Sequence, residues 1–191
     1  MTIHQEKEFS NIDYSEKTLR SREFIQCKFI GCSFVNSDLR GNVFDACVFE
    51  NCNFSMTVVD EVSFREIEFI GCKILGMDFT KCKKMLFSAQ FENSVLDYSI
   101  FFDCRLKSTK FIGCSLKEVD FSNADLTAAT FKKSNLERAT FSNSILEKTD
   151  FRGAFNFSID PEFNKMKGAK FYANQLEGLL HKYRLLVDGG A

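Results

Sequence analysis

Large apolar residues recur at every fifth position from Phe9 to Phe151, with one change of spacing between Phe79 and Leu86. A mostly small side chain lies two residues before each of these positions, for example Cys27 before Phe29 and Ala124 before Leu126. An α-helix repeats every 3.6 residues and a β-strand every two, so a period of five fits neither. The pattern predicts a coil in which each five-residue unit forms one side and one corner.

A second period sorts the apolar positions into four columns, each taken from every fourth position. The first column contains only phenylalanine: Phe9, Phe29, Phe49, Phe69, Phe91, Phe111, Phe131 and Phe151. The second contains Tyr14, Phe34, Phe54, Ile74, Leu96, Leu116 and Leu136. The third contains Leu19, Leu39, Val59, Phe79, Phe101, Phe121 and Phe141, and the fourth Phe24, Phe44, Phe64, Leu86, Leu106, Leu126 and Leu146. Such columns predict an all-β solenoid with four sides and about 20 residues per coil.

The columns stay uniform only if residues 80–86 form one side that carries a two-residue insertion. This segment contains Lys83, Lys84 and Met85. It is either a bulge without a role or an interaction loop, because loops on rigid scaffolds often carry function.

The eight cysteines follow the repeat. Seven lie two residues before a column position, and Cys82 does so if the first spacing continues through the insertion. This position suits a small buried side chain, and side chains stacked on successive coils point the same way, which is poor geometry for a disulfide. The spacing of five also lacks the paired ligands of a zinc site. We therefore expect buried structural thiols and neither a metal nor a cofactor.

Two five-residue units, Ala124–Ala128 and Ser134–Arg138, resemble the consensus of the pentapeptide repeat family, and the resemblance extends from Phe9 to Phe151. It implies a right-handed quadrilateral β-helix. Residues 69–79 and 159–190 are similar to the topoisomerase-poison resistance proteins of that family, the Qnr, AlbG and McbG types. This similarity implies a non-enzymatic, DNA-mimic-like protein that binds DNA gyrase or topoisomerase IV and protects it from a quinolone, albicidin or microcin. The alternative is a scaffolding protein with an unrelated protein partner.

The two ends depart from the repeat. Residues 1–8 are polar and are expected to cover the first coil, within a β-helix spanning residues 1–158. In the C-terminal segment 159–191, Pro161 favours a helical turn, and Asn174 with Glu177 resembles a capping box that starts an α-helix. The helix presents one apolar face, formed by Leu176, Leu179, Leu180 and Tyr183. This face either covers the last coil or, as the resemblance implies, also joins two rods into a homodimer; residues 185–187 form a short extended run.

Charge is unevenly distributed, although the net charge is only −1. Residues 1–79 carry an excess of five acidic side chains, and residues 80–191 an excess of four basic ones. Acidic residues gather on the side of the third column, opposed by Arg20, Arg40 and Lys81: they are Asp38, Asp60, Glu61, Asp78, Asp103 and Asp120. We expect a topoisomerase to contact this side and the neighbouring insertion, where carboxylates could take the place of DNA phosphates.

Several other classes of protein are disfavoured. His4 and His181 lie near opposite ends, and the chain has no glycine-rich phosphate loop, nucleophile elbow or zinc-protease signature, so we expect no enzymatic activity. No stretch resembles a membrane span or a signal peptide, which favours a cytoplasmic location. Direct nucleic-acid binding is weakly supported, because the candidate lysines are dispersed without interleaved aromatic residues: Lys81, Lys83, Lys84, Lys132 and Lys133.

Overall fold

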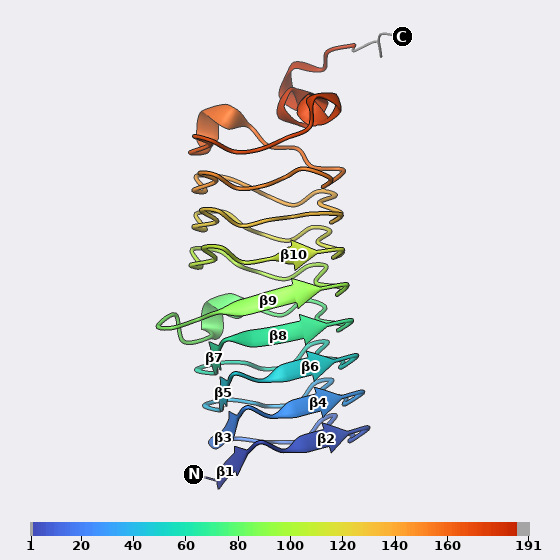
Figure 1. Ribbon diagram of the computed structural model, residues 1–191, viewed down its shortest axis with the longest axis vertical. Coiled ribbons are helices and arrows are strands. Elements are labelled where there is room, and N and C mark those ends of the chain that lie inside the picture. The colour runs from blue at the N-terminus through green and yellow to red at the C-terminus, as the bar shows by residue number, and fades with distance from the viewer. Residues whose placement is uncertain (1, 187–191) are drawn as a thin grey trace.

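The protein is a rod of parallel coils stacked along one axis, with a helical segment at the C-terminal end (Figure 1). The structure, a computed structural model, describes residues 2–186. Its strands are β1 (Thr2–Gln5), β2 (Glu8–Ser10), β3 (Arg22–Ile25), β4 (Lys28–Ile30), β5 (Val43–Asp45), β6 (Val48–Glu50), β7 (Ser63–Arg65), β8 (Ile67–Ile70), β9 (Ala89–Glu92) and β10 (Phe111–Ile112). Its helices are short 3₁₀ segments: η1 (Phe79–Lys81), η2 (Pro161–Phe163), η3 (Ala173–Leu179) and η4 (His181–Tyr183).

Four ladders of parallel pairing give the rod four faces. One face is the sheet β1-β3-β5-β7, and another is the six-stranded sheet β10-β9-β8-β6-β4-β2. The other two faces are ladders of single bridges. One begins at Asp13↔Ser33; the other, which we call the third face, contains Thr18, Asp38, Val58, Asp78, Ile100, Asp120 and Thr140. The prediction of a right-handed quadrilateral β-helix is confirmed.

The predicted columns point into the rod, except at Leu86, and their aromatic residues stack ring on ring. Phe111 is fully buried, and its ring lies 5.1 Å from those of Phe91 and Phe131, nearly parallel to both. Rings of neighbouring columns meet edge to face, as Phe101 and Phe111 do at 6.0 Å and 80°. Both arrangements suit the charge distribution of an aromatic ring. The interior is therefore an ordered aromatic stack.

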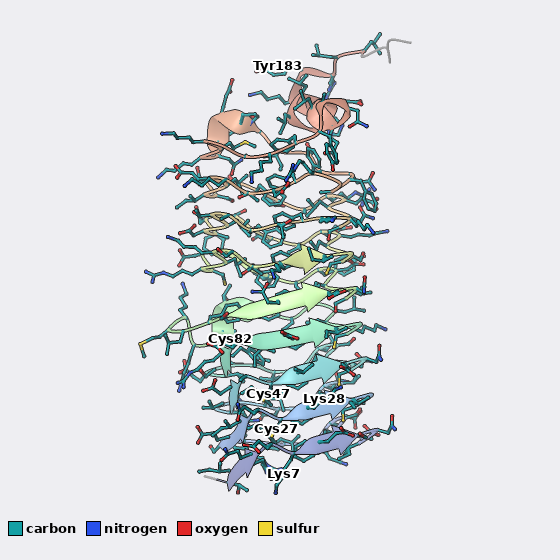
Figure 2. All side chains as sticks on the ribbon, in the orientation of Figure 1. Lys7, Cys27, Lys28, Cys47, Cys82 and Tyr183 are labelled. Carbon is teal, nitrogen blue, oxygen red and sulfur yellow. The ribbon has the colours of Figure 1, made fainter. Side chains whose placement is uncertain are left out.

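The cysteines occupy the small buried positions predicted for them. All eight are buried and free, and Cys27 and Cys47 follow one another along the rod (Figure 2). Each thiol that bonds donates to backbone oxygens, as Cys47 does to the carbonyl of Phe24 at 3.3 Å. Burial raises the pKa of the Cys47 thiol to about 12. The eight cysteines are therefore free thiols held away from solvent, as the repeat predicted.

The N-terminal residues form part of the first coil, so the prediction of a polar cap over that coil is wrong. Strand β1 pairs in parallel with β3, with His4 opposite Phe24. The His4 ring stacks on that phenylalanine at 4.9 Å and so extends the fourth column. A planar ring fits the same slot as phenylalanine, which the hydrophobic pattern alone did not reveal.

The insertion follows η1 and stands out from the side of the rod (Figure 1). Phe69 pairs with Phe91, whereas Phe9 pairs with Phe29, so this coil is two residues longer, as predicted. The assignment of Leu86 to the fourth column is wrong. Leu86 is 65% exposed and has a positive φ of 65°, and Phe87 packs against the core instead, 6.0 Å from the Phe79 ring. The left-handed turn at Leu86 reverses the direction of the next side chain, so the larger ring fills the interior.

The repeat continues beyond Phe151. Ile145 bridges to Lys165, and the Phe171 ring stacks on Phe151 at 5.0 Å, adding a member to the first column. The helical turn predicted at Pro161 is confirmed as η2, and the Asp160 side chain accepts from the backbone N–H of Glu162.

The helical cap predicted at the C-terminus is present, but its turns have 3₁₀ geometry, and it begins earlier than predicted. The Tyr172 backbone N–H donates to Gln175 Oε1 at 3.0 Å, so the capping pair is not Asn174 and Glu177. The Gln175 amide also donates to the Ala154 carbonyl and ties the first turn to the last coil. Residues 185 and 186 belong to no strand, and Val187 lies outside the described residues.

Candidate protein-binding surface

Three of the predicted site carboxylates lie on the third face, where acidic and aliphatic residues alternate. Asp38, Asp78 and Asp120 occupy every second rung of the ladder, and Val58 and Ile100 lie between them. Each carboxylate accepts a hydrogen bond from the backbone N–H two residues later, as Asp78 does from Thr80 at 3.0 Å. An Asp side chain at this position therefore stabilises the turn that follows it, independently of any role in binding.

Asp38 is held in an ion pair. Its carboxylate contacts the guanidinium groups of Arg20 and Arg40, the two bases that the sequence placed on the same side. The Arg40 side chain, bonded to the carboxylate, keeps the pKa of Asp38 far below its usual range. This end of the face presents a compensated cluster rather than a free negative charge.

Asp60 and Asp78 line one groove, together with Lys81. The groove has a volume of about 260 Å³, and its remaining lining residues are Met56, Thr57, Val58, Val59 and Gly76. Glu61 adjoins it and donates its backbone N–H to the Lys81 carbonyl at 2.8 Å. None of the three carboxylates forms a salt bridge with a described residue. The predicted acidic site is thus assembled most clearly here.

The insertion is tied to the next coil by Lys84, whose ammonium contacts the Asp103 carboxylate. Lys83 is exposed and Met85 is 80% exposed, so the loop presents both charge and apolar surface to solvent. The structure therefore pairs Lys84 and Asp103, which the sequence had placed in the same site. Asp120 lies one rung beyond Ile100, towards the C-terminal half of the rod.

Five exposed apolar side chains on and beside the third face were missed. They are Met56, Val58, Tyr98, Ile100 and Phe102. The signal was present in the repeat, because all five lie at positions that the column pattern directs towards solvent.

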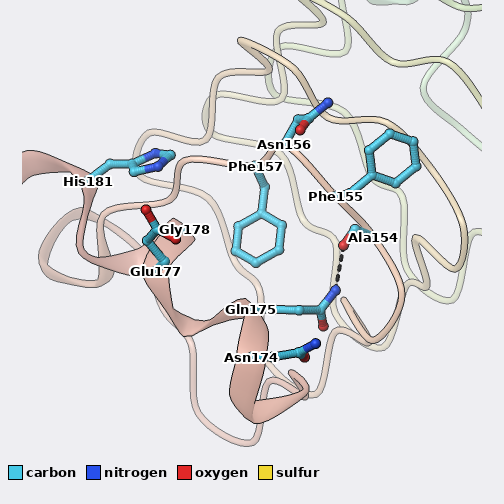
Figure 3. Close-up of a pocket in the computed structure, with 9 residues that line it drawn as sticks. All are labelled: Ala154, Phe155, Asn156, Phe157, Asn174, Gln175, Glu177, Gly178 and His181. Atoms are coloured by element: carbon cyan, nitrogen blue, oxygen red, sulfur yellow. Dashed lines mark hydrogen bonds between the residues drawn. The ribbon is translucent and has the colours of Figure 1, made fainter. Parts of the chain in front are cut away.

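The predicted dimerisation residues lie at the C-terminal end of the rod. Leu176, Leu180 and Tyr183 are exposed, whereas Leu179 packs against the core. Between the last coil and the cap lies a pocket of about 270 Å³, whose lining includes Phe155, Glu177 and His181 (Figure 3). Close packing at Gly178 sets the position of the cap, since a Cβ there would lie 2.4 Å from the Phe157 ring.

Residues 2–186 include no helix that is long and apolar enough to cross a membrane. In the same part of the chain, no three or more His, Cys, Asp or Glu side chains are placed to hold a metal ion together. The described part of the chain is thus a long rod whose middle exposes both acidic and apolar side chains.

Comparison with known proteins assigns this scaffold to a family. Residues 17–99, 42–118 and 84–154 match the pentapeptide repeat region, and the chain belongs to the pentapeptide repeat family. It is 34% identical over 107 residues to the quinolone resistance pentapeptide repeat protein QnrB96 of Scandinavium goeteborgense. That match covers 49% of this chain, and the chain spans about half the length of that curated relative, 48%.

Solved structures share the fold at lower identity. A trypsin-treated variant of QnrB1, a plasmid-mediated fluoroquinolone resistance protein, aligns over 98% of both chains with a TM-score of 0.54 and 20% identity. HetL, a pentapeptide repeat protein involved in heterocyst differentiation regulation in the cyanobacterium Nostoc sp. strain PCC 7120, gives the same TM-score at 16% identity. It aligns over 88% of this chain and 86% of its own. Because two proteins described so differently fit equally well, the fold by itself does not select a function.

Proposed function

We propose that this protein binds a bacterial type II topoisomerase, DNA gyrase or topoisomerase IV, and protects it from a quinolone-type poison. The observation that carries the proposal is the 34% identity over 107 residues to a quinolone resistance pentapeptide repeat protein. The β-helix supports it, because a regular rod can present a fixed row of side chains to a large enzyme with little loss of backbone conformational entropy on binding. The action is by binding and not by catalysis.

The contact is proposed to centre on the third face and the insertion. Asp60, Glu61 and Asp78 supply carboxylates that no described residue neutralises, and they could occupy places that DNA phosphates take on a basic enzyme surface. Asp38 contributes little, since Arg20 and Arg40 already compensate it. With a net charge of −1, the mimicry is local and does not extend over the whole rod. Attraction of this kind weakens as salt is added.

The C-terminal cap is proposed to join two rods end to end. Leu176, Leu180 and Tyr183 are exposed at this end of the rod, and Phe155 and Phe163 are exposed as well. Large exposed apolar patches commonly mark an interface, and a symmetric homodimer is the commonest oligomer. Because the target enzyme acts on chromosomal DNA, the proposed location is the cytoplasm.

The test is a DNA gyrase supercoiling assay with ciprofloxacin, in the presence and absence of the protein. The wild type is expected to restore supercoiling that the drug has inhibited. In the acidic-site variant, Asp60, Glu61 and Asp78 are changed to Asn, Gln and Asn, which keeps an oxygen acceptor for the Thr80 N–H. The matched control changes to glutamine three glutamates of the six-stranded face that form no salt bridge with a described residue: Glu8, Glu68 and Glu92.

A separate loop variant changes Lys83, Lys84 and Met85 to serine. Substitution is preferable to deletion, because shortening the loop would displace Phe87 from the core. Protection by the glutamate control and loss of protection in the acidic-site or loop variant would support the proposed surface. Wild-type protein without effect on the drug-inhibited enzyme would refute the function. Full protection by both site variants would refute the surface alone.

A further inference from the structure

The middle of the rod carries an apolar stripe, formed by Met56, Val58, Tyr98, Ile100 and Phe102. These five side chains are between 38% and 63% exposed. Val58 and Ile100 are rungs of the third face on either side of Asp78, and Phe102 follows Phe101 of the third column. Clustered exposed apolar residues on one face of a soluble protein commonly mark a protein-interaction site.

A missing side chain deepens the stripe. Met56, Gly76 and Tyr98 stand at corners of successive coils, and all three have left-handed φ angles near +60°. The Met56 sulfur lies 3.4 Å from the position that a Gly76 Cβ would occupy. Because Gly76 has no side chain, a groove opens beside Met56 and Val58 instead of a continuous ridge.

Unpaired charge borders this groove. Asp60, Asp78 and Lys81 line it, and Glu61 lies next to it. On the other side of the third column, the insertion adds Met85 and Leu86, both largely exposed. An apolar centre with a charged rim is the usual anatomy of a protein–protein interface, and methionine and aromatic residues are enriched at such centres.

This composition does not suit a surface that only imitates DNA. Aliphatic and aromatic side chains pressed against the lysines and arginines of a phosphate-binding channel would remove water from those charges without replacing its hydrogen bonds, which costs free energy. Carboxylates, in contrast, could pair with the lysines and arginines of such a channel. The stripe instead requires a partner surface that is itself apolar.

We propose that the apolar stripe docks an apolar surface of the topoisomerase that is edged by lysine or arginine, and that this contact, rather than phosphate mimicry, supplies most of the affinity. The inference rests on the proposed function. The carboxylates of Asp60 and Glu61 beside the stripe, and of Asp78 between Val58 and Ile100, orient the basic edge of the partner. Burial of the stripe then holds the complex.

Salt separates the two contributions, because screening weakens exposed charge pairs and leaves apolar contacts intact. Binding of the full-length protein to purified gyrase is measured at about 0.1 M and about 0.5 M NaCl. The stripe variant carries Val58→Thr, Ile100→Thr and Phe102→Ser, and threonine keeps the branched shape that suits a ladder position. The control variant carries Ile3→Thr and Val95→Thr, which remove exposed apolar groups elsewhere on the rod.

We expect the stripe variant to bind about tenfold or more weakly at both salt concentrations, since central apolar contacts dominate most interfaces. The acidic-site variant should be weaker mainly at low salt, and the control should bind like the wild type. Equal binding by the stripe variant and the wild type would overturn the inference and leave the proposed function standing. A wild type that does not bind gyrase would overturn both.

A second copy of this chain is the competing occupant of the stripe. Sedimentation velocity of the wild type and the stripe variant distinguishes the two possibilities. An unchanged oligomeric state in the variant supports topoisomerase as the occupant. A shift to a smaller species would show that the stripe joins copies of the protein, and would overturn the inference.

Discussion

Replacing Phe111 with alanine tests the aromatic stack most directly. The side chain is fully buried, has ring neighbours on the coils before and after it, and meets Phe101 and Phe121 edge to face. Truncation of a buried phenylalanine usually costs about 3–5 kcal/mol. We expect the upper half of that range, because the neighbouring coils are fixed by backbone pairing and cannot collapse into the cavity. Urea unfolding followed by circular dichroism measures the loss.

Two comparison variants sharpen the test. In a solenoid each coil contacts only its neighbours, so an interior coil loses two interfaces and an end coil one. Phe171 stacks only on Phe151 within the first column and is partly buried, so Phe171→Ala should cost less than Phe111→Ala. Phe102→Ala removes a ring that is 45% exposed and should change stability by about 0.5 kcal/mol or less. A Phe111→Ala protein as stable as the wild type would refute the stacking arrangement.

Four further results are expected. Gly178→Ala should release the C-terminal cap, because its Cβ would overlap the Phe157 ring; limited proteolysis should cut the variant faster after residue 171, whereas Glu177→Ala should resemble the wild type. The eight buried thiols should react with Ellman's reagent only after unfolding, and rapid reaction of the native protein would contradict their burial. Deletion of residues 174–191 should abolish the specific dimer and expose the last coil, which should make the protein aggregate. Sedimentation of the full-length protein as a monomer at high concentration would refute the proposed dimer. Because the folded-state pKa of Asp38 is lowered, its ion pairs should stabilise the protein above about pH 4, the unfolded pKa. The stability difference between wild type and Asp38→Asn should shrink as pH falls below that value, and a difference that persists in strong acid would refute the assignment.

The sequence by itself determined the repetitive part of the fold. Every coil offers the same inward slots, so large apolar residues recur at each, and the first column, phenylalanine throughout, could be followed from Phe9 to Phe151 without a structure. The small slot predicted burial of all eight cysteines for the same reason. Periodicity is a strong signal when each unit has the same environment as its neighbours.

The candidate site was only partly readable from the sequence. The gathering of acidic residues on the side of the third column placed Asp60, Glu61 and Asp78 together, because each side-chain position follows from the period. Salt bridges depend on where long, flexible side chains extend over the surface. Only the structure therefore showed that Arg20 and Arg40 compensate Asp38 and that Lys84 contacts Asp103. The apolar stripe occupies positions that the repeat directs towards solvent, but only the structure showed how far Met56 and Tyr98 are exposed.

Tertiary structure decided what happens wherever the repeat stops. At the insertion, Leu86 adopts a left-handed turn and is exposed, and Phe87 packs against the core instead. Both residues are apolar, so hydrophobicity alone could not distinguish them. At the N-terminus, packing on Phe24 brought His4 into a column of phenylalanines. At the C-terminus, the fit of Gly178 against Phe157 and the bond from Gln175 to Ala154 fixed where the cap begins. These outcomes depend on how particular side chains fit against their neighbours, and no repeating pattern in the sequence reveals that fit.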